Sequence, residues 1–410
     1  MSEYWEFGSK EHQARLERTV NPISTGELER RWAAVRKEME QRGIDVLLMQ
    51  NSNETLGGYV KYFTDLPAKM GYPESLIFPR NDRMTAVRHG PINGNVEYPP
   101  EGDPIQRGVG TLLTEPWFPS VEFTKLYMAK LVVKVLTARG DRTIGLVGTS
   151  SMAAPFLEYV KANLPHARFV DATEMVDGIK AIKSPEEVEF IRRAAAMQDA
   201  AFAAVLKAIK PGMYDFEVMS VAKHVSEDLG SEDGIYLGSS APFGQPTGIL
   251  RRRHFQGRRL QEGDYFTILI ENNGPGGFYT ELGRTVVLGK APSELKEELD
   301  LILAAQKNTL RRLIPGTSCA DIYRAHCDYM ASVNRPGESR LYAHGQGYDL
   351  VERPLIRHDE TMAVQAGMNL AVHPGHATKS FYVWICDNYI VTSGGPGECL
   401  HRTPQRIFEV

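Results

Sequence analysis

Three side chains capable of acid–base chemistry lie close together in the middle of the sequence. His254 precedes an apolar stretch, residues 265–270, which predicts a buried strand. Glu271 ends that stretch, and Glu281 follows a glycine-rich turn. One hairpin would therefore bring together a histidine and two glutamates, a combination suited to cleaving a C–N bond by general acid–base catalysis.

Each of these residues also has a purely structural interpretation. An imidazole takes up and returns protons near neutral pH, which suits His254 to catalysis, yet a backbone carbonyl could equally satisfy a core histidine. Glu271 and Glu281 could pair with Arg284 or with the arginines at 251–253 instead of a substrate. Those arginines carry guanidinium groups that bind carboxylates through two parallel hydrogen bonds, which predicts an anionic small substrate.

Composition limits the class of protein. The chain has 410 residues, a length typical of two domains, with 42% hydrophobic and 24% charged residues. A net charge of −4 without a dominant basic face argues against a nucleic-acid or anionic-membrane partner. Four scattered cysteines do not form a disulfide framework, and no apolar stretch is long enough for a membrane span. We expect a cytoplasmic protein.

Residues 1–178 have the pattern of an α/β domain. Leu28, Trp32, Val35 and Met39 share one face of a predicted helix that ends at Gly43. Apolar runs at 44–49, 75–78 and 143–147 predict buried strands in a mixed sheet.

A second domain is predicted over residues 179–410. Ser184, Pro185 and Glu187 form the N-cap, first-turn proline and capping box of a helix that continues to Lys210. Further helices alternate with short strands that carry His344, His373 and Cys386. The coarse pattern is an α+β layer in which helices cover one face of a curved antiparallel sheet.

The motifs of the second domain occur in an order that resembles the creatinase/prolidase/methionine-aminopeptidase family. They are IKSPEEVEFIRRAA at 182–195, IKPG at 209–212, HF at 254–255, GD at 263–264, GFYTELGRT at 277–285, HGQG at 344–347, GMNLAVHPG at 367–375 and DNYIVT at 387–392. The resemblance implies a pita-bread fold for the C-terminal domain. GFYTELGRT is more similar to the creatinase version of the hairpin than to the peptidase version.

The family's peptidases hold two divalent metals with two aspartates, one histidine and two glutamates. When the peptidases' ligand pattern is aligned with this sequence, the position of the first aspartate falls at Leu269 or Ile270 and that of the second at Glu281. The histidine is retained as His344, whereas the two glutamates are replaced by His373 and Cys386.

The lost carboxylates matter because hard divalent ions need several anionic oxygens. We therefore expect no pair of metal ions and no obligatory cofactor. The alternative is one softer ion held by Glu281, His344, His373 and Cys386, a ligand set that suits zinc or iron.

The resemblance implies a metal-independent, creatinase-like hydrolase that cleaves an amidine or amide C–N bond in a small, carboxylate-bearing substrate, and it also implies a homodimer. The catalytic candidates are His254, as the general acid–base group, with Glu281, His344 and Glu271. The substrate-binding candidates are Arg251, Arg253, His373, Tyr279 and Glu352.

Three alternatives stay open at this point. One is a mononuclear metal-dependent lyase or hydrolase, similar to the family's dimethylsulfoniopropionate-cleaving branch. The others are a metallopeptidase and a non-catalytic binding protein, because a fold alone does not fix a reaction.

Overall fold

The computed structural model describes residues 21–53, 55–56, 58–68, 70–247 and 251–410. The chain divides into two compact units, Met1–Lys180 and Ala181–Val410. Within the described ranges, no helix combines the length and the apolar character needed to cross a bilayer.

A mixed sheet forms the centre of the N-terminal unit. Among the described residues it has seven strands in the order β4-β5-β3-β2-β1-β6-β7. The strands are β1 (Val46–Asn51), β2 (Glu74–Pro79), β3 (Met84–His89), β4 (Gly94–Glu97), β5 (Val109–Glu115), β6 (Thr143–Val147) and β7 (Arg168–Asp171). β1 pairs antiparallel with β2 and parallel with β6, so the predicted α/β class with a mixed sheet is confirmed.

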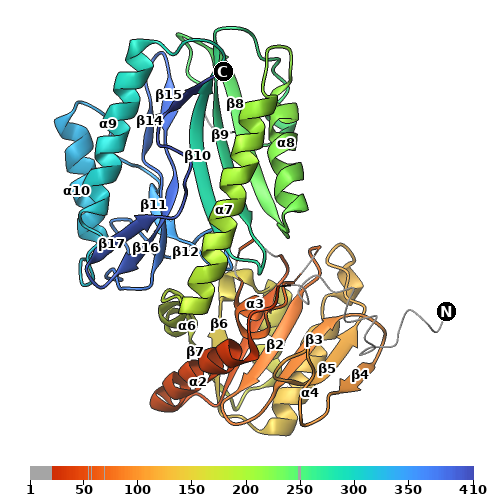
Figure 1. Ribbon diagram of the computed structural model, residues 1–410. Coiled ribbons are helices and arrows are strands. Elements are labelled where there is room, and N and C mark those ends of the chain that lie inside the picture. Colours follow the sequence, from red (N-terminus) through yellow and green to blue (C-terminus); the bar gives the residue numbers. More distant parts are fainter. Residues whose placement is uncertain (1–20, 54, 57, 69, 248–250) are drawn as a thin grey trace. The chain divides into compact units, whose positions relative to one another are not determined.

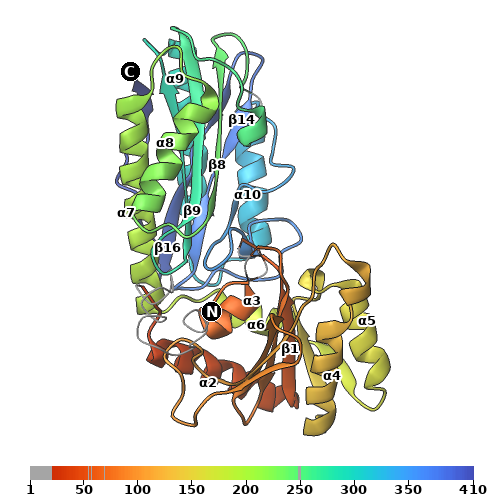
Figure 2. The ribbon, with the colours of Figure 1, turned by 90° about the vertical axis from the view of Figure 1, so that its right-hand side faces the viewer.

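Helices cover both faces of this sheet. They are α2 (Thr25–Arg42), α3 (Tyr59–Thr64), α4 (Tyr127–Arg139), α5 (Ala154–Asn163) and α6 (Thr173–Lys180). Figure 2 shows α4 and α5 on one face and α2, α3 and α6 on the other. Both faces of β1 and β2 are buried as a result, which explains their continuous apolar sequences.

The C-terminal unit is built on two larger sheets and one short hairpin. In the part of the chain that the structure describes, a four-stranded sheet has the order β18-β10-β9-β8, a five-stranded sheet has the order β12-β11-β13-β16-β17, and β14 pairs with β15. The strands are β8 (Gly234–Pro242), β9 (Asp264–Asn273), β10 (Tyr279–Val287), β11 (Ala343–Gly345), β12 (Glu352–Leu355), β13 (Asn369–Val372), β14 (Gly375–Ala377), β15 (Tyr382–Trp384), β16 (Asp387–Thr392), β17 (Gly395–Cys399) and β18 (Ile407–Glu409).

Two helix pairs lie on opposite sides of these sheets (Figure 1). They are α7 (Pro185–Ala208) with α8 (Asp215–Asp228), and α9 (Ser293–Leu310) with α10 (Cys319–Ser332). The predicted capping box of α7 is present, with Ser184 and Glu187 bonded to each other's backbone N–H groups. The expectation that helices cover only one face is wrong. β9 is buried along its whole length, so its second face also needs cover, and β15 and α9 provide it.

Candidate active site

The register of the β9–β10 hairpin places the two predicted glutamates side by side. Glu271 and Glu281 are directly opposite partners, so both side chains project from the same face of the sheet. Their neighbours Ile270 and Leu282 project from the other face into the core under α7 and α8. Glu271 is 6% exposed and Glu281 is 4% exposed, so the sheet holds two adjacent buried carboxyl groups.

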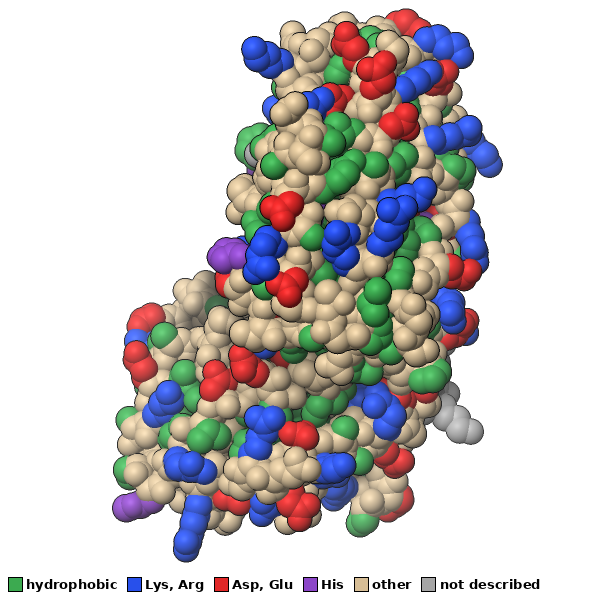
Figure 3. Space-filling model, turned by 90° about the vertical axis from the view of Figure 1, so that its left-hand side faces the viewer, with side chains coloured by type: hydrophobic (Ala, Val, Ile, Leu, Met, Phe, Trp, Pro, Cys, Tyr) green, Lys and Arg blue, Asp and Glu red, His purple; other side chains and the backbone are tan. Residues whose placement is uncertain are grey.

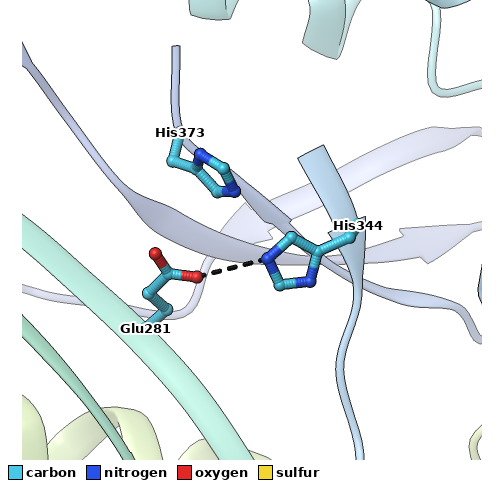
Figure 4. A group of neighbouring side chains, drawn as sticks. All are labelled: Glu281, His344 and His373. Carbon is cyan, nitrogen blue, oxygen red and sulfur yellow. Dashed lines mark ion pairs between the residues drawn. The ribbon is translucent and has the colours of Figure 1, made fainter. Parts of the chain in front are cut away.

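Two histidines from the five-stranded sheet approach Glu281 (Figure 4). His344 lies in β11, and its Nε2 is 3.5 Å from Oε2 of Glu281. His373 directly follows β13, and its ring centroid is 5.1 Å from that of His344. Each of the three residues offers one ligand atom, and these atoms all lie within 4.8 Å of one another. Oε2 of Glu281 is buried and makes no hydrogen bond, so it is an acceptor directed at this group.

A network of buried amides holds the two glutamates in position. Nε2 of Gln346 donates to Glu271 at 3.1 Å, and Oε1 of Gln346 accepts from Asn388 at 2.8 Å. Oδ1 of Asn388 in turn accepts from the backbone N–H of Glu281 at 2.8 Å. Asn369 closes the network by accepting from Asn388 and donating to the carbonyl of Gln346. The motifs HGQG, GMNLAVHPG and DNYIVT contain these amides, for which no role was predicted.

The local electrostatics separate the two carboxyl groups. Burial and the charge of Glu281 raise the pKa of Glu271 well above its usual range. Burial alone would also raise the pKa of Glu281, but His373 and His344 outweigh it and the pKa is lowered. Burial lowers the pKa of His373 to about 4. The raised pKa favours the neutral acid at Glu271 and the lowered pKa favours the carboxylate at Glu281, a pattern typical of acid–base sites.

Cys386 lies beside this group and does not complete it. Its thiol donates to the carbonyl of Glu281 at 3.3 Å, and burial raises its pKa well above the usual range. A buried thiol of this kind is a poor metal ligand because ligation requires the thiolate. Elsewhere, Asp387, Cys399 and His401 also lie within 4.8 Å of one another. In this second group, the carboxylate of Asp387 accepts a hydrogen bond from Arg284, and Nε2 of His401 lies 2.9 Å from Oε1 of Gln198. Two of its three possible ligand residues therefore already have hydrogen-bond partners.

The structure does not bring His254 into the Glu281 group. His254 lies in an exposed 3₁₀ turn, Arg253–Phe255, before the hairpin begins. Two contacts hold this segment along β8, the edge strand. The carbonyl of Arg251 accepts from the N–H of Gly238 at 3.1 Å, and the side chain of Gln256 donates to the carbonyl of Tyr236 at 3.2 Å. Arg251 and Arg253 are exposed on the same segment.

Two further substrate-binding candidates have structural partners. Tyr279 is buried at the start of β10, where its N–H donates to the carbonyl of Gly347 at 2.7 Å. Glu352 forms a buried ion pair with Lys183, and Arg353 pairs with Glu360.

Comparison with known proteins identifies relatives of several kinds. The model of metallopeptidase family M24 matches residues 189–393. An ectoine hydrolase from Halomonas elongata is 26% identical over 412 residues, covering 94% of this chain and 98% of the relative. A creatinase from Bacillus sp. is 24% identical, and the match covers 87% of this chain and 85% of the relative. A Xaa-Pro dipeptidase from Pyrococcus furiosus is 25% identical, and the match covers 63% of this chain and 73% of the relative.

Solved structures confirm the predicted pita-bread fold. An X-Pro aminopeptidase from Thermotoga maritima superposes with a TM-score of 0.75 at 18% identity, covering 92% of this chain and 99% of that one. The dipeptidase PepE from Mycobacterium ulcerans gives a TM-score of 0.74 at 21% identity, covering 95% and 99%. At these identities the likeness concerns the fold.

Proposed function

This chain belongs to metallopeptidase family M24, as its ordered motifs predict, and we propose that it is a hydrolase that cleaves a non-peptide C–N bond in a small polar substrate. The sequence match to the ectoine hydrolase spans nearly the whole of both chains, and the match to the creatinase spans more than four fifths. The match to the Xaa-Pro dipeptidase spans about two thirds of this chain. Among these three sequence relatives, coverage is greater for the two hydrolases than for the dipeptidase, which supports the proposal, whereas the solved peptidase structures cover as much of the chain.

The observation that carries this proposal is the buried group of Glu281, His344 and His373, with Glu271 opposite Glu281. The resemblance to the family's peptidases gives four carboxylates at the ligand positions, and Glu281 alone corresponds to one of them here. A charge of −1 from Glu281 and two imidazoles cannot offset two divalent ions in a buried site, so a dinuclear centre does not fit these residues.

One divalent ion does fit the group. Two imidazoles and one carboxylate form a donor set typical of catalytic single-ion sites, and Oε2 of Glu281 lacks a hydrogen-bond partner. Glu281, His344 and His373 would hold such an ion, and it would supply Lewis-acid polarisation of the substrate. The metal independence expected from the lost carboxylates therefore has no support in this geometry.

The residues of the chain suggest the following course of hydrolysis. The carboxylate oxygen of Glu281 that does not hold the ion accepts a proton from water as the water oxygen bonds to the amide or amidine carbon. The C–N bond then breaks, and Glu281 returns the proton to the leaving nitrogen. Glu271, in its neutral form, donates a hydrogen bond to the negative charge that develops on the substrate, as neutral acids do in apolar sites.

A substrate panel tests the proposal directly. The full-length protein is incubated with ectoine, creatine, N-acyl amino acids and Xaa-Pro dipeptides, and products are identified by mass spectrometry. We expect hydrolysis among the first three groups, and Glu281→Gln should lower kcat/KM by about 100- to 10,000-fold. Glu294→Gln, at an exposed position in α9, is the matched control and should retain full activity.

Other results would point to the alternatives. Cleavage of Xaa-Pro dipeptides alone would make the protein a peptidase, and formation of an alkene without water uptake would make it a lyase. A loss of activity in His254→Ala as large as in Glu281→Gln would return the acid–base role to His254.

Metal content is a separate prediction. We expect elemental analysis of the purified protein to find up to one divalent ion per chain, and His344→Ala or His373→Ala to weaken its binding at least tenfold. Cys386→Ala should leave the metal content unchanged, because its thiol is engaged by the carbonyl of Glu281. Two ions per chain would contradict the charge argument.

A further inference from the structure

A cavity of about 380 Å³ lies in the C-terminal unit between α8 and β8, away from the Glu281 group. Figure 2 shows α8 running beside this edge strand. Phe216, Met219, Ile235 and Leu237 contribute apolar walls, and Lys223, Arg252 and Arg253 contribute positive charge. None of the residues that line the cavity is acidic, and none belongs to the Glu281 group. The cavity therefore combines an apolar interior with a cationic rim.

Arg253 is held in a defined orientation at this cavity. Its guanidinium carbon lies 3.8 Å from the centroid of the Phe216 ring. Phe216 stacks on Tyr214 with ring centroids 5.4 Å apart. The guanidinium carbon of Arg259 lies 4.2 Å from the centroid of the Tyr214 ring. Stacking uses the face of a guanidinium and leaves its N–H groups, which lie in the plane, available to an acceptor.

The charges at the cavity are only partly compensated. Lys223 lies 3.6 Å from Glu227, in an exposed pair that contributes little. Over the described ranges, no carboxylate forms an ion pair with Arg252 or Arg253, whereas Arg258, five residues further along the chain from Arg253, pairs with Asp264. The two arginines therefore present unneutralised positive charge beside an apolar surface.

A buried side chain fixes the segment that carries these arginines. Gln256 is 1% exposed, and its Nε2 donates to the carbonyl of Arg251 at 2.6 Å and to that of Tyr236 at 3.2 Å. These contacts tie the arginine segment to β8 and shape the wall of the cavity. The buried side chain of Gln256 therefore holds the arginine segment in place, in addition to the contacts that the segment makes at the surface.

We propose that this cavity is a binding site for a small organic carboxylate, whose charged end pairs with Arg252 and Arg253 and whose apolar body packs on Phe216 and Met219. A forked guanidinium matches the two oxygens of a carboxylate, and the apolar walls favour a hydrocarbon chain over a fully hydrated inorganic anion. The inference concerns binding, and it stands whether or not the hydrolysis proposed above is correct.

Calorimetric titration of the full-length protein with hexanoate tests the site, with hexanamide as the uncharged analogue and inorganic phosphate as the alternative anion. We expect one hexanoate to bind per chain and hexanamide to bind at least ten times more weakly. The affinity for hexanoate should fall as the salt concentration is raised. Arg253→Gln should weaken hexanoate binding at least tenfold. Arg259→Gln removes the other arginine stacked on the same aromatic pair, outside the cavity, and should change binding less than twofold.

Three results would overturn the proposal. Phosphate binding as tightly as hexanoate would indicate a general anion site. Hexanoate affinity that Arg253→Gln leaves intact and Glu281→Gln abolishes would place the carboxylate in the active site. Absence of saturable hexanoate binding would rule the site out. Circular dichroism establishes that each variant folds, and Phe216→Leu, which keeps the apolar wall but removes the stacking ring, should weaken binding by about threefold.

Discussion

Glu271 and Glu281 are neighbours of the same residue type whose pKa values are shifted in opposite directions. Burial and the charge of Glu281 raise the pKa of Glu271, whereas His373 and His344 lower that of Glu281. Because a neutral acid needs no counter-charge, only Glu281 depends on the two neighbouring imidazoles. Substitutions at the two positions should therefore differ in their effect on stability.

We expect Glu271→Gln to change the free energy of unfolding by less than about 1 kcal/mol, since the amide keeps an oxygen that can accept from Gln346. Glu271→Leu should cost about 1–3 kcal/mol, because it leaves the N–H of Gln346 with fewer acceptors in a buried site. Urea unfolding at pH 7 measures both. Equal losses for the two variants would indicate that Glu271 is held as a charged group.

His326 provides a pH test at the residue scale. Its ring stacks on Tyr342 with centroids 3.7 Å apart, and burial lowers its pKa to about 4. The unfolded ring titrates near 6.5, so stability is complete above about pH 6.5 and declines as the pH falls toward 4, while only the unfolded chain takes up the proton. The difference corresponds to roughly 3 kcal/mol.

His326→Phe should remove this component. Urea midpoints at pH 7.5 and 4.5 should show wild type losing roughly 3 kcal/mol more than the variant over that interval. His224→Gln, at an exposed position in α8, serves as the control and should lose as much as wild type. The same acid-induced loss in wild type and His326→Phe would mean that His326 is already protonated in the folded protein.

Sequence motifs could predict that Glu281, His344 and His373 belong to one site, because each occupies a position with a known place in the resembling family. They could not place His254. Its position depends on a backbone bond between Arg251 and Gly238 and on the side chain of Gln256, and no local pattern encodes such contacts. The amide network of Gln346 was not predicted either, because buried amides have no characteristic spacing in a sequence.

At the scale of elements, the close approach of two strands positions the candidate site. Gly283 in β10 exchanges backbone hydrogen bonds with Cys386, which directly precedes β16. A side chain cannot fit there: a Cβ at Gly283 would lie 2.5 Å from the ring of Trp384 and 2.9 Å from Cβ of Cys386. This contact connects the hairpin carrying Glu281 to the sheet carrying the histidines.

Gly283→Ala should therefore lower the free energy of unfolding by about 1–3 kcal/mol, the usual cost of overpacking a tight interior. Chemical denaturation with fluorescence detection measures the change. Gly178→Ala, in α6, is the control, because nothing lies within 4 Å of the added Cβ and alanine favours a helix. A Gly283→Ala protein as stable as wild type would show that the two sheets separate easily at this point.

Long elements could be bounded from the sequence, whereas short strands could be expected only around single residues such as His344. The capping box of α7 and the apolar strand β9 carry strong local signals. Strands such as β11 and β15 have three residues each, too few for a periodic pattern, and their pairings join distant parts of the chain. Helices α9 and α10 were predicted, but the side of the sheets that they cover was not, because covering both faces of β9 is a property of the packed sheet.

At the scale of the whole molecule, the sequence has nearly balanced charge. On the face drawn in Figure 3, basic and acidic side chains are interspersed, in keeping with a net charge of −4. Several large apolar side chains of the N-terminal unit are nevertheless exposed. Met70 is 85%, Phe123 77% and Ile92 70% exposed, and Phe118 contacts the stacked rings of Tyr72 and His89.

A contiguous apolar patch on a surface marks an interaction site, so these exposed side chains are the ones to test for an interface. Together with the homodimer implied by the family resemblance, they lead us to expect a particle of twice 45.8 kDa in light scattering coupled to size exclusion. The double variant Ile92→Ser/Phe123→Ser should shift the mass toward one chain without altering the circular dichroism spectrum. The control is Leu229→Ser, an exposed apolar position of the C-terminal unit. A wild-type mass of one chain would refute the homodimer, and a double variant that stays dimeric would place the interface elsewhere.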